Sequence, residues 1–216
     1  MSKLSLVVLI SGSGSNLQAI IDAIEAGTLQ AEIKAVISNR PQAYGLERAQ
    51  QHGIATISLD HKDYSSRELF DQKLQQEIDQ LQPDFLVLAG YMRILSESFI
   101  QHFWPRILNI HPSLLPKYQG LHTHQRALDN GDKQHGVSIH VVTPELDAGP
   151  VIVQGDFAIE DGDDADSLQQ KAHRLEHKMY PLVLSWLSEG RLQLPHGEPV
   201  FDNQKLNKPL NYHHVS

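Results

Sequence analysis

Three polar residues in the middle of the chain have the types and spacing needed for acyl transfer to an amine. Asn109 and His111 lie two positions apart at the end of an apolar segment, so in an extended chain their side chains point to the same side. Asp147 lies in a later loop, next to a Gly-Pro pair. N–H groups from Asn109 and His111 could both bind the oxyanion of a tetrahedral intermediate.

The carboxylate of Asp147 completes this chemistry. A carboxylate near the imidazole would favour the protonated ring and raise the pKa of His111. It could also help to relay the proton that an attacking amine loses. Spacing alone leaves another interpretation open, because a histidine after a strand is often structural and Asn and Asp are common turn residues.

A glycine-rich loop, Gly12–Asn16, follows the first apolar segment and precedes a helical pattern. Backbone N–H groups and the positive end of a helix dipole at such a point suit an anion. A dinucleotide fingerprint is not met, because Leu17 occupies the third glycine position and Ser38–Arg40 lacks the acidic residue that holds a ribose. The loop favours a single phosphate monoester, and the alternative is a tight turn without a ligand.

The elements that position these residues alternate between strand and helix in the first half. This alternation predicts an α/β fold with an open, mostly parallel twisted sheet and helices on both faces. We expect strands at Leu4–Ile10, Ile33–Ser38, Ala55–Leu59, Phe85–Ala89 and Ile107–Ile110. Helices are expected at Asn16–Ala26, Tyr44–His52, from a capping box at Ser65–Glu68 to about Gln80, and at Ser96–Phe103.

The second half is less regular. A helix at Leu121–Asn130 precedes two expected strands, Val137–Val142 and Val151–Ala158, which form an antiparallel extension of the sheet. Asp164 is expected to cap a long helix, Ala165–Glu189. We expect one domain, 1–216, with a phosphate-binding half at 1–106, a catalytic half at 107–194 and an irregular tail at 195–216.

Composition excludes several classes of function. The 216 residues carry a formal net charge of −8, which disfavours a nucleic-acid binder. There is no cysteine, so disulfides, thiolate nucleophiles and cysteine-bound metals are excluded. No apolar run is long enough for a membrane span, and the start does not resemble a signal peptide. We therefore expect a cytoplasmic protein that binds small molecules, without nucleic-acid or membrane partners, as a monomer or weak homodimer.

From about Leu6 to about Trp186 the sequence resembles the phosphoribosylglycinamide formyltransferase family, which has a Rossmann-like formyltransferase fold. The stretches that carry the resemblance keep the family's order: Ile10–Ile20, Leu88–Leu95, Leu108–Pro116, Gly120–His124 and Glu145–Pro150. The resemblance implies transfer of the formyl group of 10-formyltetrahydrofolate to the amine of 5-phosphoribosylglycinamide, without a metal.

The resemblance also implies roles for individual residues. Asn109, His111 and Asp147 would be catalytic. The glycinamide substrate would be bound by Gly14, Ser15, Asn16, His173, Arg174, Leu175 and Glu176, with the phosphate at the first three and ribose hydroxyls at Glu176. The folate would be bound by Arg67, Met92, Arg93, Ile94, Leu95, Asn109, Thr143, Pro144, Glu145, Leu146 and Asp147.

Two positions depart from the family pattern. Ser13 is a mild change beside the phosphate loop. Gln119 replaces a loop proline, and we expect it to loosen the segment before Leu121.

Other activities remain as alternatives. A methionyl-tRNA formyltransferase would carry a further basic domain, whereas this chain is short and acidic. A formyltetrahydrofolate hydrolase would use water in place of the amine. A zinc enzyme is suggested by 13 histidines, among them His122, His124, His135 and His140, although no helical ligand motif accompanies them. A non-enzymatic nucleotide-binding module is the last alternative.

Overall fold

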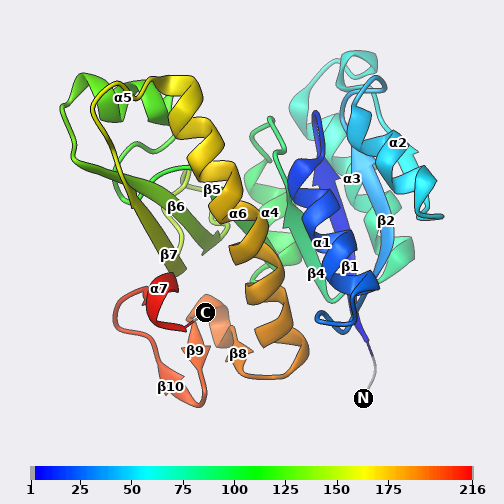
Figure 1. The fold of residues 1–216 in the computed structure, drawn as a ribbon. Coiled ribbons are helices and arrows are strands. Elements are labelled where there is room, and N and C mark those ends of the chain that lie inside the picture. Colours follow the sequence, from blue (N-terminus) through cyan, green and yellow to red (C-terminus); the bar gives the residue numbers. More distant parts are fainter. Residues whose placement is uncertain (1–2, 216) are drawn as a thin grey trace.

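The fold of the computed structural model, which describes residues 3–215, is built on one open, twisted sheet (Figure 1). Its eight strands have the order β11-β7-β6-β5-β4-β1-β2-β3. These strands are β1 (Leu4–Ile10), β2 (Ala31–Ser38), β3 (Thr56–Ser58), β4 (Phe85–Leu88), β5 (Ile107–His111), β6 (Gln134–Val141), β7 (Val151–Ala158) and β11 (Leu210–Asn211).

The direction of the strands changes in the second half. Strands β1 to β5 pair in parallel, as the alternation of strand and helix predicts. Strand β6 runs antiparallel to both β5 and β7, and this confirms the expected antiparallel extension. The short β11 pairs in parallel with β7.

Helices cover both faces of the sheet, as expected. The helices are α1 (Ser15–Glu25), α2 (Tyr44–Gln51), α3 (Arg67–Leu81), α4 (Glu97–Phe103), α5 (Thr123–Asp129), α6 (Ala165–Ser188) and α7 (Tyr212–Val215). Helices α1, α2 and α6 contribute to the hydrophobic cluster on one face, and α3 and α4 contribute to the cluster on the other. Strand β1 serves both clusters, because successive side chains alternate between the faces: Leu6, Val8 and Ile10 on one, Val7 and Leu9 on the other. Each such buried side chain contributes about 1.5–3 kcal/mol.

The strand order reverses between β1 and β4, where ligands of open α/β sheets usually bind. The loop after β1 and the loop after β4 are joined there by two hydrogen bonds. Ser11 N donates to the Gly90 carbonyl at 3.2 Å, and Met92 N donates to Ser11 Oγ at 2.7 Å. The predicted phosphate loop and the predicted folate segment are therefore neighbours.

The tail differs from the expectation of an irregular segment at 195–216. Strands β8 (Leu192–Gln193), β9 (Val200–Phe201) and β10 (Gln204–Lys205) form a small antiparallel sheet, and β11 and α7 follow it. Aromatic contacts anchor this sheet, since the Phe201 ring lies 4.8 Å from that of the buried Trp186. Strands of two residues give no periodic pattern, which is why the sequence did not reveal them.

The capping box also lies elsewhere than expected. Helix α3 begins at Arg67, and its cap is Ser66, whose Oγ accepts a hydrogen bond from Leu69 N at 3.2 Å. The reciprocal pair of bonds occurs at α6, where Asp164 and Ser167 each accept from the other's backbone N–H. The predicted cap at Asp164 is therefore confirmed.

Within residues 3–215, no helix is both long and apolar enough to cross a membrane.

Candidate functional site

The structure brings Asn109, His111 and Asp147 together at the end of β5. Asn109 and His111 belong to β5, and Asp147 lies in the loop between β6 and β7. His111 Nδ1 lies 3.4 Å from Asp147 Oδ2, and Asn109 Nδ2 donates to Asp147 Oδ1 at 3.4 Å. The side chains of His111 and Asp147 are each only 8% exposed, so their charges interact in a largely dry environment.

Asp147 is kept as a carboxylate by its partners. Burial by itself would raise its pKa, but the nearby His140 ring, the hydrogen bond from Gly120 N–H and the nearby His111 hold the pKa below its ordinary value. Gly120 N donates to Asp147 Oδ2 at 2.9 Å. Asp147 therefore carries its negative charge at neutral pH.

The protonation of His111 differs from our expectation. Burial lowers the pKa of His111, and this outweighs the opposite effects of the Tyr118 carbonyl and of Asp147. His111 Nε2 lies 2.8 Å from the Tyr118 carbonyl oxygen, which can only accept a hydrogen bond, so Nε2 carries a proton. The expectation of a raised pKa for His111 is therefore wrong, because the burial of the ring was not visible in the sequence.

His140 is a member of this cluster that sequence reasoning did not assign to it. It lies directly opposite Asn109 in the antiparallel pair β5–β6 and is 2% exposed. Its Nδ1 lies 3.0 Å from the Val141 carbonyl, so Nδ1 is protonated and Nε2 is free to accept from Asn109 Nδ2 at 3.1 Å. Only the strand register, which the sequence does not give, identifies this residue.

The predicted phosphate loop lies at the start of α1. Gly14 has φ +70° and is the residue before the helix, and no side chain among the described residues caps this end. A Cβ at Gly14 would come within 2.6 Å of Gly45 Cα, so the close approach of two backbones requires glycine. Ser15 and Asn16 begin the helix, and their backbone N–H groups are available to an anion.

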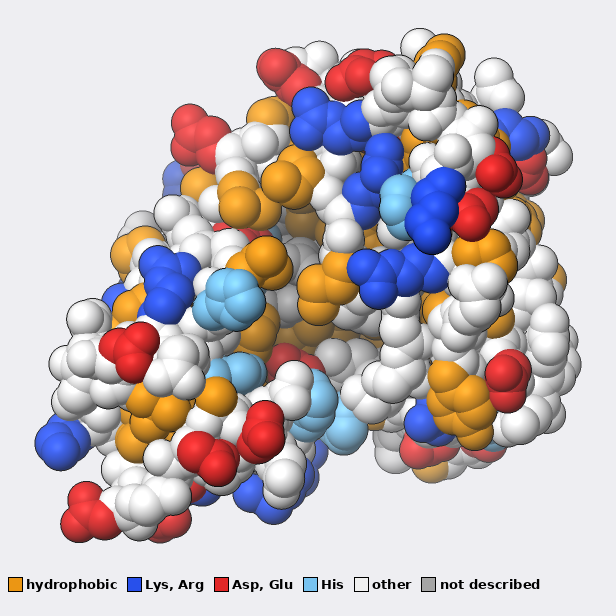
Figure 2. All heavy atoms as spheres, turned by 90° about the horizontal axis from the view of Figure 1, so that it is seen from above, with side chains coloured by type: hydrophobic (Ala, Val, Ile, Leu, Met, Phe, Trp, Pro, Cys, Tyr) orange, Lys and Arg blue, Asp and Glu red, His pale blue; other side chains and the backbone are white. Residues whose placement is uncertain are grey.

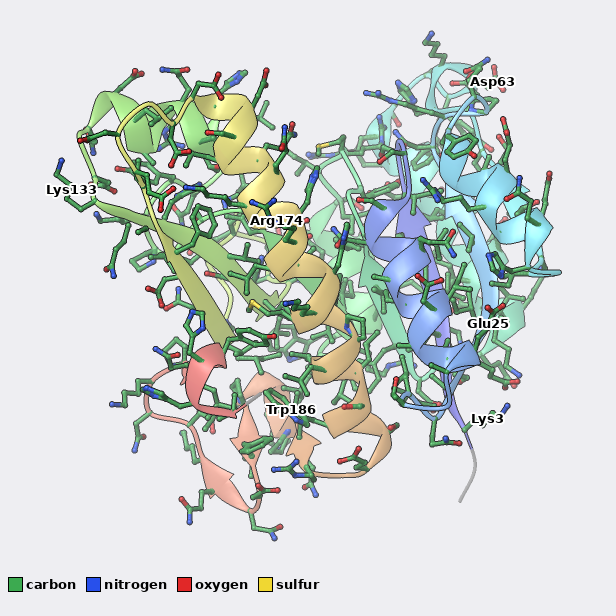
Figure 3. The ribbon with its side chains drawn as sticks, viewed as in Figure 1. Lys3, Glu25, Asp63, Lys133, Arg174 and Trp186 are labelled. Atoms are coloured by element: carbon green, nitrogen blue, oxygen red, sulfur yellow. The ribbon has the colours of Figure 1, made fainter. Side chains whose placement is uncertain are left out.

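The segment 173–176 of α6 lies against α1, but its members differ in position (Figure 3). Glu176 is 5% exposed and accepts a hydrogen bond from Asn16 Nδ2 at 2.8 Å, so it joins the phosphate loop directly. Burial raises the pKa of Glu176. Arg174, labelled in Figure 3, is exposed, whereas Leu175 packs in the hydrophobic core. The Leu175 side chain therefore serves the core.

A shallow cavity of about 400 Å³ opens beside the phosphate loop. Sequence reasoning missed two of the residues that line it, Arg48 and His177. Arg48 Nε donates to the Ser13 carbonyl at 2.8 Å, which places a cation next to the loop. His177 Nε2 is buried without a partner.

The segment Met92–Leu95 combines exposed apolar and buried parts. Met92 and Ile94 are 64% and 54% exposed, which is unusual for such side chains, whereas Leu95 is buried. The guanidinium of Arg93 lies 4.6 Å from the Phe70 ring. Arg67, which resemblance assigns to the same ligand, is the first residue of α3 and forms an ion pair of 3.5 Å with Glu68.

Asp71 is bonded to the residue that follows this segment, and sequence reasoning also missed it. Its side chain is on α3, is 2% exposed, and accepts a hydrogen bond from Ser96 N at 2.5 Å. Burial raises the pKa of Asp71, and the nearby Arg93 and Arg67 oppose that rise. The helical spacing of the buried positions along α3 could have indicated that the Asp71 side chain faces inward.

The surface has a hollow at one end of the molecule. Figure 2 shows it from above, with hydrophobic side chains, histidines and several Lys and Arg side chains along its rim. In the Thr143–Asp147 loop, Leu146 is 51% exposed. Among residues 3–215, no group of three or more His, Cys, Asp or Glu side chains is arranged to hold a metal ion.

Comparisons with known proteins show the family of this chain. A family model described as formyl transferase matches residues 4–184. The phosphoribosylglycinamide formyltransferase of Escherichia coli is 52% identical over 203 residues, which are 94% of this chain and 96% of that protein.

Solved structures show the same likeness. A phosphoribosylglycinamide formyltransferase from Coxiella burnetii has a TM-score of 0.93 at 50% identity, covering 97% of this chain and 99% of that one. Glycinamide ribonucleotide transformylase 1 from Symbiobacterium toebii has a TM-score of 0.88 at 39% identity, covering 93% and 94%. With nearly its whole length matched in sequence and in fold, the chain belongs to the phosphoribosylglycinamide formyltransferase family.

Proposed function

We propose that Asn109, His111 and Asp147 carry out the reaction of this family in this chain. The reaction moves the formyl group of 10-formyltetrahydrofolate to the amine of 5-phosphoribosylglycinamide, in purine biosynthesis. The observation that supports these roles is the contact of Asp147 with both Asn109 and His111 at the carboxyl end of β5.

The substrate amine attacks the formyl carbon, and a tetrahedral intermediate with a negative oxygen forms. Asn109 Nδ2 and a ring N–H of His111 stabilise that oxygen. The bond from carbon to N10 of the folate then breaks, the amine loses a proton, and N10 gains one. Asp147, as a carboxylate beside His111, assists the removal of the amine proton. The products are formylglycinamide ribonucleotide and tetrahydrofolate.

The structure adds one requirement to this mechanism. The proton on His111 Nε2 is held by the Tyr118 carbonyl. For this N–H to serve the oxyanion, the formyl oxygen must replace that carbonyl when the substrates bind. Asn109 needs a similar change, because its two amide N–H groups already face His140 Nε2 at 3.1 Å and Asp147 Oδ1 at 3.4 Å. The formyl oxygen would replace the longer of these two contacts.

The two substrates are assigned to two separate groups of residues. The phosphate lies at Gly14–Asn16, where helix N–H groups and the nearby Arg48 favour an anion. Glu176 lies next to Asn16 and binds the ribose hydroxyls, with His173 and Arg174 on the same helix completing this side. The folate lies against the exposed Met92 and Ile94, between Arg67 and the 143–147 loop.

A coupled assay with both substrates tests the activity. Formation of tetrahydrofolate should require phosphoribosylglycinamide and should saturate with it. Loss of the formyl group at the same rate without that acceptor would instead show a hydrolase, and it would contradict the proposal. The phosphate-binding geometry at Gly14 favours the phosphorylated acceptor.

We also propose that the chain works in the cytoplasm as a monomer or weak homodimer, since its substrates are small water-soluble molecules. Sedimentation at micromolar and submicromolar protein would test the second part. A dimer that persists at submicromolar concentration would contradict it.

A further inference from the structure

Gln119 lies beside the catalytic cluster, although the sequence predicts for it only a looser loop. Its side-chain Nε2 donates to the Asp147 backbone carbonyl at 3.2 Å. A carbonyl oxygen can only accept, so this contact requires the amide nitrogen of Gln119 and not its oxygen. A proline at this position would have no such donor.

Asp147 needs support from outside its own loop. Its φ of +49° is in the left-handed region, which residues other than glycine seldom adopt. Such a conformation persists only where surrounding contacts hold it. Gly120 N holds the carboxylate at Oδ2, and Gln119 holds the backbone carbonyl of the same residue.

Gln119 is in turn tied to helix α5. Arg126 Nη1 donates to the Gln119 carbonyl at 2.7 Å and to the Leu121 carbonyl at 3.4 Å. The Arg126 guanidinium also lies 5.1 Å from the centre of the Tyr118 ring, and the Tyr118 carbonyl accepts from His111. A continuous set of contacts therefore runs from α5 through Gln119 to Asp147.

We propose that Gln119 is a positioning residue that fixes the backbone of Asp147 for formyl transfer. The inference rests on the proposed function, because it takes Asp147 as the carboxylate that assists the reaction. Gln119 itself touches no reacting atom. It acts by limiting the movement of Asp147 away from His111 and Asn109, which lie at 3.4 Å from that carboxylate.

The test is a set of substitutions at Gln119 with both substrates saturating. Gln119→Met keeps the length of the side chain but removes the donor, and we expect kcat to fall about threefold to tenfold, the effect of one net hydrogen bond. KM for both substrates and the melting temperature should stay unchanged. Gln119→Lys restores a donor and should recover most of kcat. Gln125→Ala is the matched control, because Gln125 bonds to Asp129 within α5.

A double-mutant cycle with Arg126→Lys tests the connection to α5 while keeping the positive charge. If Arg126 acts through Gln119, the two substitutions together should slow the enzyme no more than the larger single effect. Additive effects would contradict this connection. The proposal is overturned if Gln119→Met keeps wild-type kcat, if KM and melting temperature change in step with kcat, or if Gln119→Lys is as slow as Gln119→Met. An inactive wild-type enzyme would refute the proposed function instead.

Discussion

The two halves of the main sheet differ in how their backbones are built. In residues 3–106 the only residue other than glycine with a left-handed φ is Gln82, at the end of α3. In residues 107–194 there are three, Tyr118, His122 and Asp147. Asp147 is a member of the catalytic cluster, and the Tyr118 carbonyl lies 2.8 Å from His111 Nε2. A residue of the catalytic cluster, Asp147, thus adopts a left-handed φ in the antiparallel half, whereas the phosphate loop of the parallel half uses Gly14 for this conformation.

Buried polar groups divide in the same way. The buried histidines His111, His135 and His140 all belong to the second half. Buried polar residues of the first half are Ser, Asn and Asp, and they mostly accept or donate bonds that tie loops together. We therefore expect substitutions in the catalytic cluster of the second half to act on kcat, and substitutions at the phosphate loop of the first half to act on substrate affinity. The buried histidines should also make the stability of the second half sensitive to acid.

The largest expected effect is on catalysis. His111→Ala removes an oxyanion donor, and Asp147→Ala removes the neighbouring carboxylate, so each should lower kcat by about 10²–10³. Steady-state kinetics with both substrates would measure this, with the melting temperature as a control for folding. Wild-type turnover in either variant would refute the assignment.

Acid should destabilise the second half through His135. Burial, with the nearby His124, lowers the pKa of His135 from 6.5 to about 4. Between these values the unfolded chain binds a proton that the folded chain does not, so stability falls as pH falls from 6.5 towards about 4 and the loss stops below that. The loss is about 3 kcal/mol.

Urea unfolding at several pH values would measure this effect. In the His135→Gln variant, the free energy of unfolding should fall less between pH 6.5 and about 4. If that variant loses as much stability in acid as the wild type does, groups other than His135 cause the loss. Activity should also fall in acid, because the substrate amine becomes protonated.

The backbone of the phosphate loop gives a prediction for the first half. Gly14→Ala would place a methyl group 2.6 Å from Gly45 Cα, at a φ of +70°. We expect a loss of stability of about 2 kcal/mol and a higher KM for phosphoribosylglycinamide, with kcat less affected. A variant with reduced kcat and unchanged KM would contradict the assignment of the Gly14 loop to substrate binding.

The smallest predicted effect concerns Asp71. Asp71→Asn keeps an acceptor for Ser96 N but removes the charge near Arg93. We expect KM for 10-formyltetrahydrofolate to rise by about threefold to tenfold, since a bond to a charged group is worth about 1 kcal/mol more than a neutral one. Titration with the folate substrate would show it, and an unchanged KM would remove Asp71 from the folate side.

Sequence could predict most of the first half, because short apolar strands alternate there with polar turns and amphipathic helices. Ligands of open α/β sheets bind at the carboxyl ends of the strands, and the sequence places Asn109, His111 and the phosphate loop at such strand ends. The rest depends on distances in three dimensions. His140 is identified by its register with Asn109, Gln119 by the path of a loop, and the pKa of His111 by burial.

The claim that His111 serves catalysis and not substrate binding is tested most directly with the His111→Ala variant. Titration calorimetry would measure its binding of phosphoribosylglycinamide in the absence of folate. The wild-type Kd should be kept, although turnover of the same variant is lost by about two orders of magnitude or more. A Kd that weakens in proportion to the loss of turnover would contradict the account, because His111 would then serve binding and not the chemical step.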